Sequence, residues 1–443
     1  VYETIKKLAA DIRENPRPVI LECVTFRMRG HEEASGTKYV PKELFDIWGR
    51  KDPVATFEKF LLDEGVLTED LIEKERALIK REIEEGLEIT FAELNPKPET
   101  EKELREIFKP VEIKDNMPGS GSNTNIRFID AISHALKLAM RVHPQLVLMG
   151  QDIADYGGVF KITEGFAEQF GKERVRNTPL CESAILGAGF GLSINGAKAM
   201  VEMQFADFVS EGMTQIVNNL AKSHYRWGQH ADVVVRMPTG AAVAAGPFHS
   251  QSNEAWFFKT PGLKIAYPAF PSDAKGLLLS AFEDPNPVMY FEHKALYRSI
   301  SEDVYDDYYT IPFGKAKLVR EGNDLTIVTY GLGVHWALEA LTEHKDIRAD
   351  LIDLRTLAPL DTETIFESVK KTGRVIVMHE DTLTGGIAGE IASLISEHCF
   401  ECLDAPVMRE GSLDTPVPMN VDLEHNFLPK ERFKQKLRKL ASY

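Results

Sequence analysis

One stretch of the sequence, residues 177–208, combines a single carboxyl group with a long run of small and apolar residues. Glu182 follows Leu180 and Cys181, and three glycines lie within the ten residues after it. Glycine weakens a helix but lets another backbone or a flat ring approach closely. A carboxyl group in apolar surroundings has its charged form disfavoured, so it can hold or pass a proton near neutral pH. The stretch predicts acid–base chemistry by Glu182; a helix-capping or salt-bridged glutamate is the simpler alternative.

Alternating strand and helix patterns surround this stretch. Helices are predicted at 125–140 and 272–281, and short apolar strands at 146–149, 231–237, 264–267 and 288–291. This alternation is typical of a parallel sheet between helices. After an acidic boundary, a smaller α/β domain is predicted from strands at 324–330, 350–353 and 374–378.

The beginning of the chain has a different pattern. A helix is predicted at 2–12, a buried strand at 19–24, and charge-dense packing helices at 40–87. The loop at 25–36, with its single histidine, His31, leaves the carboxyl end of that strand, where ligand sites of open α/β sheets gather. A single strand is not stable alone, so this one needs partners from upstream or from elsewhere in the chain.

Composition excludes several classes of protein. The net charge is −16 with no basic stripe, which argues against a nucleic-acid partner, and no apolar run is long enough to cross a membrane. Four cysteines in 443 residues argue against a disulfide scaffold and for a reducing compartment. Cys399 and Cys402 have redox or metal spacing but no second ligand pair, so two core cysteines are the simpler interpretation. The glycines from Gly187 lack the spacing of a dinucleotide fingerprint.

Three motifs carry a family resemblance: Asn-Thr-Pro-Leu-Cys-Glu at 177–182, Gln-Phe-Ala-Asp-Phe at 204–208 and His-Ser-Gln at 249–251. They resemble the beta subunit of the thiamine-dependent 2-oxo acid dehydrogenases, and the branched-chain member most. The resemblance extends from about residue 125 to 443, and residues 1 to about 98 are similar to the last part of the alpha subunit. The chain therefore resembles an alpha–beta fusion without its front end.

The resemblance implies the fold and its divisions. It implies a thiamine-diphosphate-binding α/β fold, with a parallel sheet flanked by helices, followed by a smaller α/β domain like the C-terminal domain of transketolase. The expected divisions are an alpha-type part with a helical extension at 1–115, a linker at 116–124, a beta-type pyrimidine-binding domain at 125–303, and the transketolase C-terminal-like domain at 304–443.

The resemblance also implies roles for side chains around thiamine diphosphate. Glu182 would supply the carboxyl group at the aminopyrimidine nitrogen, and Phe208 would stack on that ring. His249 would serve acylation of the lipoyl arm or orient intermediates, and His31 would reach the cofactor near its reactive carbon. The other positions that match the cofactor side are Leu180 and Gln204.

Simpler interpretations remain for the same side chains. Phe208 can be an ordinary core residue, His249 a buried structural histidine and His31 a solvated loop residue. Regulated members of the family carry a phosphorylatable serine directly after the loop histidine, where this chain has Glu32. Control by phosphorylation at that position is therefore not expected.

The resemblance also implies two metal sites, but this chain contains the expected residues of only one of them. In the family, Mg and the diphosphate are held by a motif that begins Gly-Asp-Gly, which does not occur in these residues. The Mg ligands are therefore expected upstream of Val1, and the chain by itself is expected to be inert. A potassium site of branched-chain relatives matches Ala281, Asp284 and Asn286.

The expected activity is oxidative decarboxylation of branched-chain 2-oxo acids of the 3-methyl-2-oxobutanoate type. The acyl group would pass to the lipoyl-lysine of a dihydrolipoyl acyltransferase, and the fused chains would form a homodimer. The expected compartment is the cytoplasm in a bacterium or the mitochondrial matrix in a eukaryote. Two alternatives stay open: pyruvate as the substrate, and an inactive fragment that acts only as an interaction module. The His31 loop and the His-Ser-Gln motif argue against transketolase-like carbon–carbon transfer.

Overall fold

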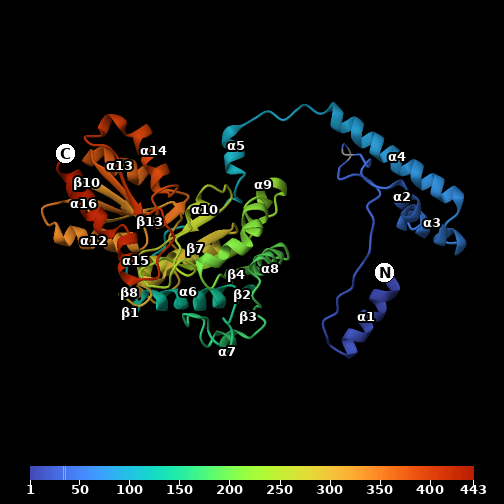
Figure 1. The fold of residues 1–443 in the computed structure, drawn as a ribbon, viewed down its shortest axis with the longest axis horizontal. Helices are drawn as coiled ribbons and strands as arrows, with labels where there is room; N and C mark the ends of the chain where they lie inside the picture. The colour runs from blue at the N-terminus through green and yellow to red at the C-terminus, as the bar shows by residue number, and fades with distance from the viewer. Residues whose placement is uncertain (33, 35) are drawn as a thin grey trace. The chain divides into compact units, whose positions relative to one another are not determined.

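The computed structural model describes residues 1–32, 34 and 36–443 (Figure 1). Two positions of the loop expected at 25–36, residues 33 and 35, lie outside the described residues. The chain divides into two units, Val1–Pro98 and Glu99–Tyr443, each of which is considered by itself.

The first unit is helical in its described residues. Its helices are α1 (Tyr2–Glu14), α2 (Lys42–Gly49), α3 (Pro53–Asp63) and α4 (Glu69–Ala92). The Asp52 side chain caps α3 by accepting hydrogen bonds from the amides of Val54 and Ala55, at 2.9 and 3.0 Å. Thr68 caps α4 through the amide of Leu71. These starts confirm the predicted helical segment, since both caps satisfy amides that a first helical turn leaves unpaired.

The strand predicted at 19–24 is wrong. These residues have no strand pairing, and the side chains of Ile20 and Val24 are 97% and 73% exposed. An apolar run becomes a strand only when a neighbouring strand accepts its hydrogen bonds. The described residues of this unit contain no other strand, so the run stays irregular.

The second unit contains a seven-stranded sheet in the order β12-β6-β7-β5-β4-β2-β3. Every pairing is parallel except that of β12 (Thr356–Ala358) with β6. The parallel strands are β2 (Leu146–Gly150), β3 (Val175–Asn177), β4 (Lys198–Glu202), β5 (Val233–Thr239), β6 (Lys264–Ala266) and β7 (Val288–His293). The predicted parallel sheet is confirmed.

Helices cover both faces of this sheet. Met200, Val234 and Tyr290 pack with α6 (Phe128–Val142) and α11 (Pro271–Glu283) in one hydrophobic cluster. Their strand neighbours, such as Val201 and Val235, pack with α8 (Glu182–Ile194) in another. Because successive strand residues point to opposite faces, both faces are buried, which explains why these strands are largely apolar.

The smaller C-terminal domain, coloured orange to red in Figure 1, has a five-stranded sheet. The strand order is β14-β13-β10-β11-β9. Its strands are β9 (Lys317–Arg320), β10 (Leu325–Thr329), β11 (Ala349–Asp353), β13 (Val375–Thr382) and β14 (Met408–Ser412), and β9 is antiparallel to β11. Its helices are α12 (Leu332–Glu343), α13 (Thr362–Thr372), α14 (Ala388–His398), α15 (Val421–Phe427) and α16 (Lys430–Ala441). The predicted second α/β domain is confirmed.

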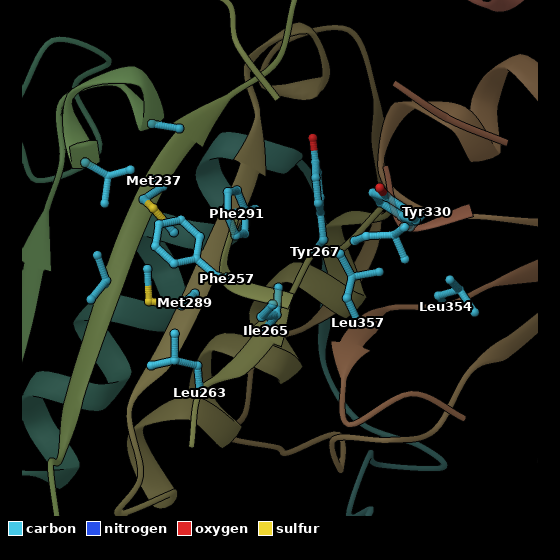
Figure 2. Close-up of a cluster of buried hydrophobic side chains, with 14 of the residues drawn as sticks. Met237, Phe257, Leu263, Ile265, Tyr267, Met289, Phe291, Tyr330, Leu354 and Leu357 are labelled. Carbon is cyan, nitrogen blue, oxygen red and sulfur yellow. The ribbon is translucent and has the colours of Figure 1, made fainter. Parts of the chain in front are cut away.

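One hydrophobic cluster joins the two sheets. Figure 2 shows Tyr267 between Phe291 and Tyr330 of the C-terminal domain, and the ring of Tyr267 lies 5.5 Å from that of Phe291 and 5.1 Å from that of Tyr330. Strand β12 also crosses from the C-terminal domain to pair with β6. The two domains therefore form one packed body.

Residues 99–122 are attached to this body. The Lys109 amide donates to Asn286 Oδ1 at 2.8 Å, and the Asn116 amide donates to the Thr310 carbonyl. Strand β1 (Asn123–Arg127) pairs with β8 (Ser301–Tyr305) in a separate two-stranded sheet. Residues 99–122 consequently belong to the second unit, and the division falls at Pro98.

The helices and the cysteines give no sign of a membrane span or a metal centre in the part of the chain that the structure describes. Across residues 1–32, 34 and 36–443, no helix is both long and apolar enough to cross a membrane. Within the same residues, no group of three or more His, Cys, Asp or Glu side chains is arranged to hold a metal ion. Cys399 is buried and Cys402 exposed, and both are free.

A buried acid at the junction of the domains should make stability depend on pH. Glu254 is fully buried and accepts a hydrogen bond from the Tyr330 hydroxyl at 2.7 Å. Burial, with the nearby carboxylates of Asp381 and Glu380, raises the pKa of Glu254 to about 8. An unfolded chain loses this proton near pH 4.5, so between pH 5 and 8 the folded state binds more protons. The free energy of unfolding should therefore fall as pH rises, by at most about 1.4 kcal/mol per pH unit.

The variant Glu254→Gln should lose this dependence because its side chain stays neutral at every pH. Urea unfolding at pH 5 and pH 8 checks this, with the exposed Glu397→Gln as control. Relative to wild type, Glu254→Gln should gain stability at pH 8, and the control should not. An identical pH dependence in wild type and Glu254→Gln would contradict the assignment.

Candidate active site

Glu182 is placed by the connection between β3 and α8. The Thr178 amide donates to the Gly150 carbonyl at 2.9 Å, which attaches this connection to the end of β2. Helix α8 then begins at Glu182 and runs close above the sheet. At Gly189 an added Cβ would lie 2.9 Å from Val201 Cγ1, so only glycine allows this approach. The small residues after Glu182 thus allow the helix to pack closely.

The Glu182 carboxyl group has one bonded oxygen and one open oxygen. The side chain is 8% exposed, and Oε1 accepts a hydrogen bond from Gln151 Nε2 at 2.9 Å. Among the described residues, Oε2 has no hydrogen-bond partner. Glu182 lines a pocket of about 470 Å³, together with Leu180, Cys181, Ser183, Ala184, Gly187, Glu211 and Gln215. A carboxyl group held in this way can exchange a proton with a group bound in the pocket.

A cluster of rings forms the second part of the site. The imidazole of His249 meets Phe205 and Phe208 edge to face, with ring centroids 4.8 and 5.5 Å apart. Phe205 also lies 5.8 Å from Phe208 and 5.6 Å from Phe160. Phe208 and His249 are half-buried, so each keeps an accessible surface. The cluster can supply an aromatic face and an imidazole at the same place.

Close packing connects the two parts. Helix α8 lies against the 3-10 helix η1 (Ala206–Gly212), which carries Phe208. An added Cβ at Gly212 would lie 2.1 Å from Leu186 Cδ1 of α8, so the contact is tight. The positions of Glu182 and Phe208 are therefore fixed relative to each other.

The other predicted cofactor-side residues have different positions. Leu180 lines the Glu182 pocket and is 79% exposed, so it is a rim residue and not part of the core. Gln204 is half-buried directly before the ring cluster. His31 is exposed and belongs to the first unit, Val1–Pro98, which is described separately from this site.

The predicted potassium residues lie together at the end of α11. Ala281, Asp284 and Asn286 are all buried there. Asp284 pairs with Lys264 through Oδ2, and its Oδ1 accepts from the side-chain amide of Asn286 at 2.7 Å. Asn286 Oδ1 accepts from the Lys109 amide. The side-chain oxygens already have protein donors. The potassium contacts expected from the resemblance are largely backbone carbonyls, so the site stays a prediction and no step is assigned to it.

Two site residues were missed in the sequence. Gln151 directly follows β2, at the carboxyl edge of the sheet, and this position was the signal that could have found it. Asp207 is buried, and its Oδ1 accepts from the amide and the side chain of Gln251 at 3.1 and 3.0 Å. An acid inside the aromatic motif at 204–208 was the signal for Asp207.

Comparisons with known proteins identify the family of each part of the chain. Residues 1–101 match the family model of the dehydrogenase E1 component, 124–299 that of the transketolase pyrimidine-binding domain, and 314–432 that of the transketolase C-terminal domain. The 2-oxoisovalerate dehydrogenase subunit beta of Bacillus subtilis (strain 168) is 46% identical over 324 residues, which are 71% of this chain and 98% of that subunit.

A second relative and a solved structure extend the comparison. The pyruvate dehydrogenase E1 component subunit beta of the same organism is 42% identical over 308 residues, 69% of this chain and 94% of that subunit. A split-gene transketolase, solved as an inactive beta4 tetramer, has a TM-score of 0.59 at 23% identity and covers 73% of this chain and 99% of its own. The solved structure supports the fold, and the relatives support the family.

Proposed function

The chain belongs to the thiamine-dependent 2-oxo acid dehydrogenases, with alpha-type and beta-type parts joined in one chain, and on this basis we propose a substrate and a site. The substrate class is the branched-chain 2-oxo acids, which the enzyme decarboxylates oxidatively, passing the acyl group to a lipoyl-lysine. The beta subunit with 46% identity is named for 2-oxoisovalerate, and the one with 42% identity for pyruvate. The substrate proposal follows this difference and the motifs in the sequence.

The observation that carries the proposal is the carboxyl group of Glu182. Its open oxygen at the wall of a pocket fits a ring nitrogen that must be protonated, as in the aminopyrimidine of thiamine diphosphate. When bound, thiamine diphosphate supplies an electron sink for the negative charge left on the substrate as carbon dioxide departs. The pocket fits the pyrimidine end of this cofactor.

The side chains of this part of the chain would then have separate tasks. Glu182 would hold and move a proton at the ring nitrogen, while Gln151 fixes the orientation of its carboxyl group by donating to the other oxygen. Leu180 at the rim would exclude water from the pocket. Phe208 would offer an aromatic face to the ring, with His249 packed against its edge.

The diphosphate end of the cofactor has no counterpart in the described residues. They contain no cluster of acids or histidines for a metal, and the sequence contains no Gly-Asp-Gly. No residue is therefore assigned to Mg. We place His31 on the cofactor side because the first unit matches the dehydrogenase E1 component.

The partners follow from the same proposal. The acyl group would pass to the lipoyl-lysine of a dihydrolipoyl acyltransferase, and two fused chains would pair through their beta-type parts. The expected compartment is the bacterial cytoplasm or, in a eukaryote, the mitochondrial matrix. An inactive interaction module is the competing function, and it predicts no turnover at all.

The test is a substrate comparison with the full-length protein. With thiamine diphosphate, Mg²⁺ and a redox dye as electron acceptor, kcat/KM is measured for 3-methyl-2-oxobutanoate and for pyruvate. A pocket that accommodates two extra methyl groups should favour the branched substrate by about 10-fold or more. A preference for pyruvate would overturn the substrate assignment, and no carbon dioxide from either acid would overturn the enzymatic function.

A further inference from the structure

The loop at 240–246 connects β5 to the segment that carries His249, and its backbone is strained. Ala242 and Ala244 have φ angles of 63° and 55°. For residues other than glycine this left-handed conformation is unfavourable, because the Cβ approaches the following carbonyl. Such a conformation persists only where the surroundings hold it.

Two carboxylates of the C-terminal domain hold this loop. Glu380 Oε1, from β13, accepts a hydrogen bond from the Ala241 amide at 2.6 Å. Both carboxylate oxygens of Glu424, from α15, lie 3.1 to 3.2 Å from the Ala244 amide. Glu380 and Glu424 are 6% and 2% exposed. The Ala241 bond is buried, so it is stronger than a bond to solvent, and the Ala244 bonds are partly buried.

The start of the loop is fixed from the opposite side. Lys294 Nζ donates to the Gly240 carbonyl at 2.6 Å. Gly240 has a φ of 91° and lies against the His293 ring, where an added Cβ would come within 2.2 Å of Nε2. His293 in turn bonds Glu380 Oε2 at 2.6 Å, so the same carboxylate orders the loop directly and through the ring.

The segment after the loop is fixed beside the ring cluster. Asp207, next to Phe208, accepts two hydrogen bonds from Gln251. The Gln251 carbonyl accepts from Thr239 Oγ1 at 2.9 Å, which brings the end of the segment back to β5. His249 lies between these anchors, so its position against Phe205 and Phe208 depends on the path of the loop.

We propose that Glu424 and Glu380 are positioning residues, through which the C-terminal domain holds the strained loop and so places the imidazole of His249 against Phe205 and Phe208. The effect of the two residues on the loop depends only on the hydrogen bonds described above. The consequence for catalysis, a loss of acyl transfer when the loop is released, rests on the proposed function.

Glu424 is the better residue to change. Glu380 also accepts from Ser252 Oγ and bonds His293, so its loss would disturb several contacts. Among the described residues, the Glu424 side chain bonds only the Ala244 amide. Glu424→Ala removes the acceptor, whereas Glu424→Gln keeps one acceptor oxygen. Asp422→Ala removes an exposed acid from the same helix and is the matched control.

The first readout needs no turnover. Amide hydrogen exchange in the 240–246 segment should rise about fivefold or more in Glu424→Ala, as expected for one lost hydrogen bond, and stay near wild type in Glu424→Gln and Asp422→Ala. The carbethoxylation rate of His249 should change only in Glu424→Ala. Unchanged exchange at 240–246, or an equal rise across α15, would overturn the positioning role.

The second readout uses turnover by the full-length protein with a lipoylated acceptor domain. In Glu424→Ala, kcat for acyl transfer should fall about tenfold at unchanged KM for the 2-oxo acid, with recovery in Glu424→Gln. Unchanged kcat alongside faster exchange would overturn the catalytic consequence. A wild-type protein without turnover would refute the proposed function, and the exchange experiment would still decide the positioning role.

Discussion

Replacing Glu182 by Gln is expected to lower kcat for 2-oxo acid decarboxylation by about 10²–10⁴-fold, the range for removal of a general acid–base group. The amide has nearly the same shape, and its oxygen can still accept from Gln151 Nε2. The amide cannot take up or release a proton as the carboxyl group does. The measurement is carbon dioxide release by the full-length protein at saturating thiamine diphosphate and Mg²⁺.

The matched control is Glu211→Gln. Glu211 lines the same pocket but is exposed, so the variant makes the same change of charge at the pocket without removing the buried acid. Its kcat should stay within about threefold of wild type, because surface charges act weakly through water. If both variants lost activity equally, the effect would belong to pocket charge and not to proton transfer by Glu182.

Replacing Arg236 by Met is expected to lower the free energy of unfolding by about 3–5 kcal/mol, the cost of breaking a buried ion pair from one side. Arg236 is 1% exposed and pairs with Glu202 of β4 and Glu292 of β7. Tyr297 donates a further hydrogen bond to Glu292 at 2.7 Å. Without the guanidinium, two carboxylates remain buried without their cation.

Burial already raises the pKa of Glu202, and Arg236 opposes this shift by favouring the charged form. The variant should consequently unfold at lower urea concentration, with the largest loss at high pH, where Glu202 must ionise without its cation. Arg438→Met is the control, since Arg438 is exposed and has no ion pair among the described residues. Equal urea midpoints for Arg236→Met and the control would contradict a structural role for the network.

The fold could be predicted where burial dictates the pattern. Strands β5 and β7 are covered on both faces, so the largely apolar stretches at 231–237 and 288–291 mark them clearly. Edge strands such as β9 and β12 are short and partly polar, and they depend on partners distant in sequence, so no local pattern marked them. The run at 19–24 is apolar but forms no strand, because an apolar pattern alone cannot supply a pairing strand.

The residues of the candidate site also differ in whether the sequence could predict them. Glu182, Phe208 and His249 belong to motifs that can be recognised along the chain. Gln151 is 31 positions from Glu182, and Glu424 is 180 positions from Ala244, so only the fold shows that these pairs bond. The reactive groups could therefore be predicted from the sequence. The side chains that hold and orient them could not.

The most direct test of the central claim, that the Glu182 pocket receives the cofactor, uses a neighbouring thiol. Cys181 lines this pocket and is half-buried, whereas Cys402 is free and exposed on the C-terminal domain. The rates at which iodoacetamide alkylates the two thiols are measured by mass spectrometry in the full-length protein, with and without thiamine diphosphate and Mg²⁺. A cofactor at 100 times its Kd leaves about 1% of sites open, so alkylation of Cys181 should slow at least tenfold and that of Cys402 should not change. An unchanged rate at Cys181, under conditions that support turnover, would show that the cofactor binds elsewhere.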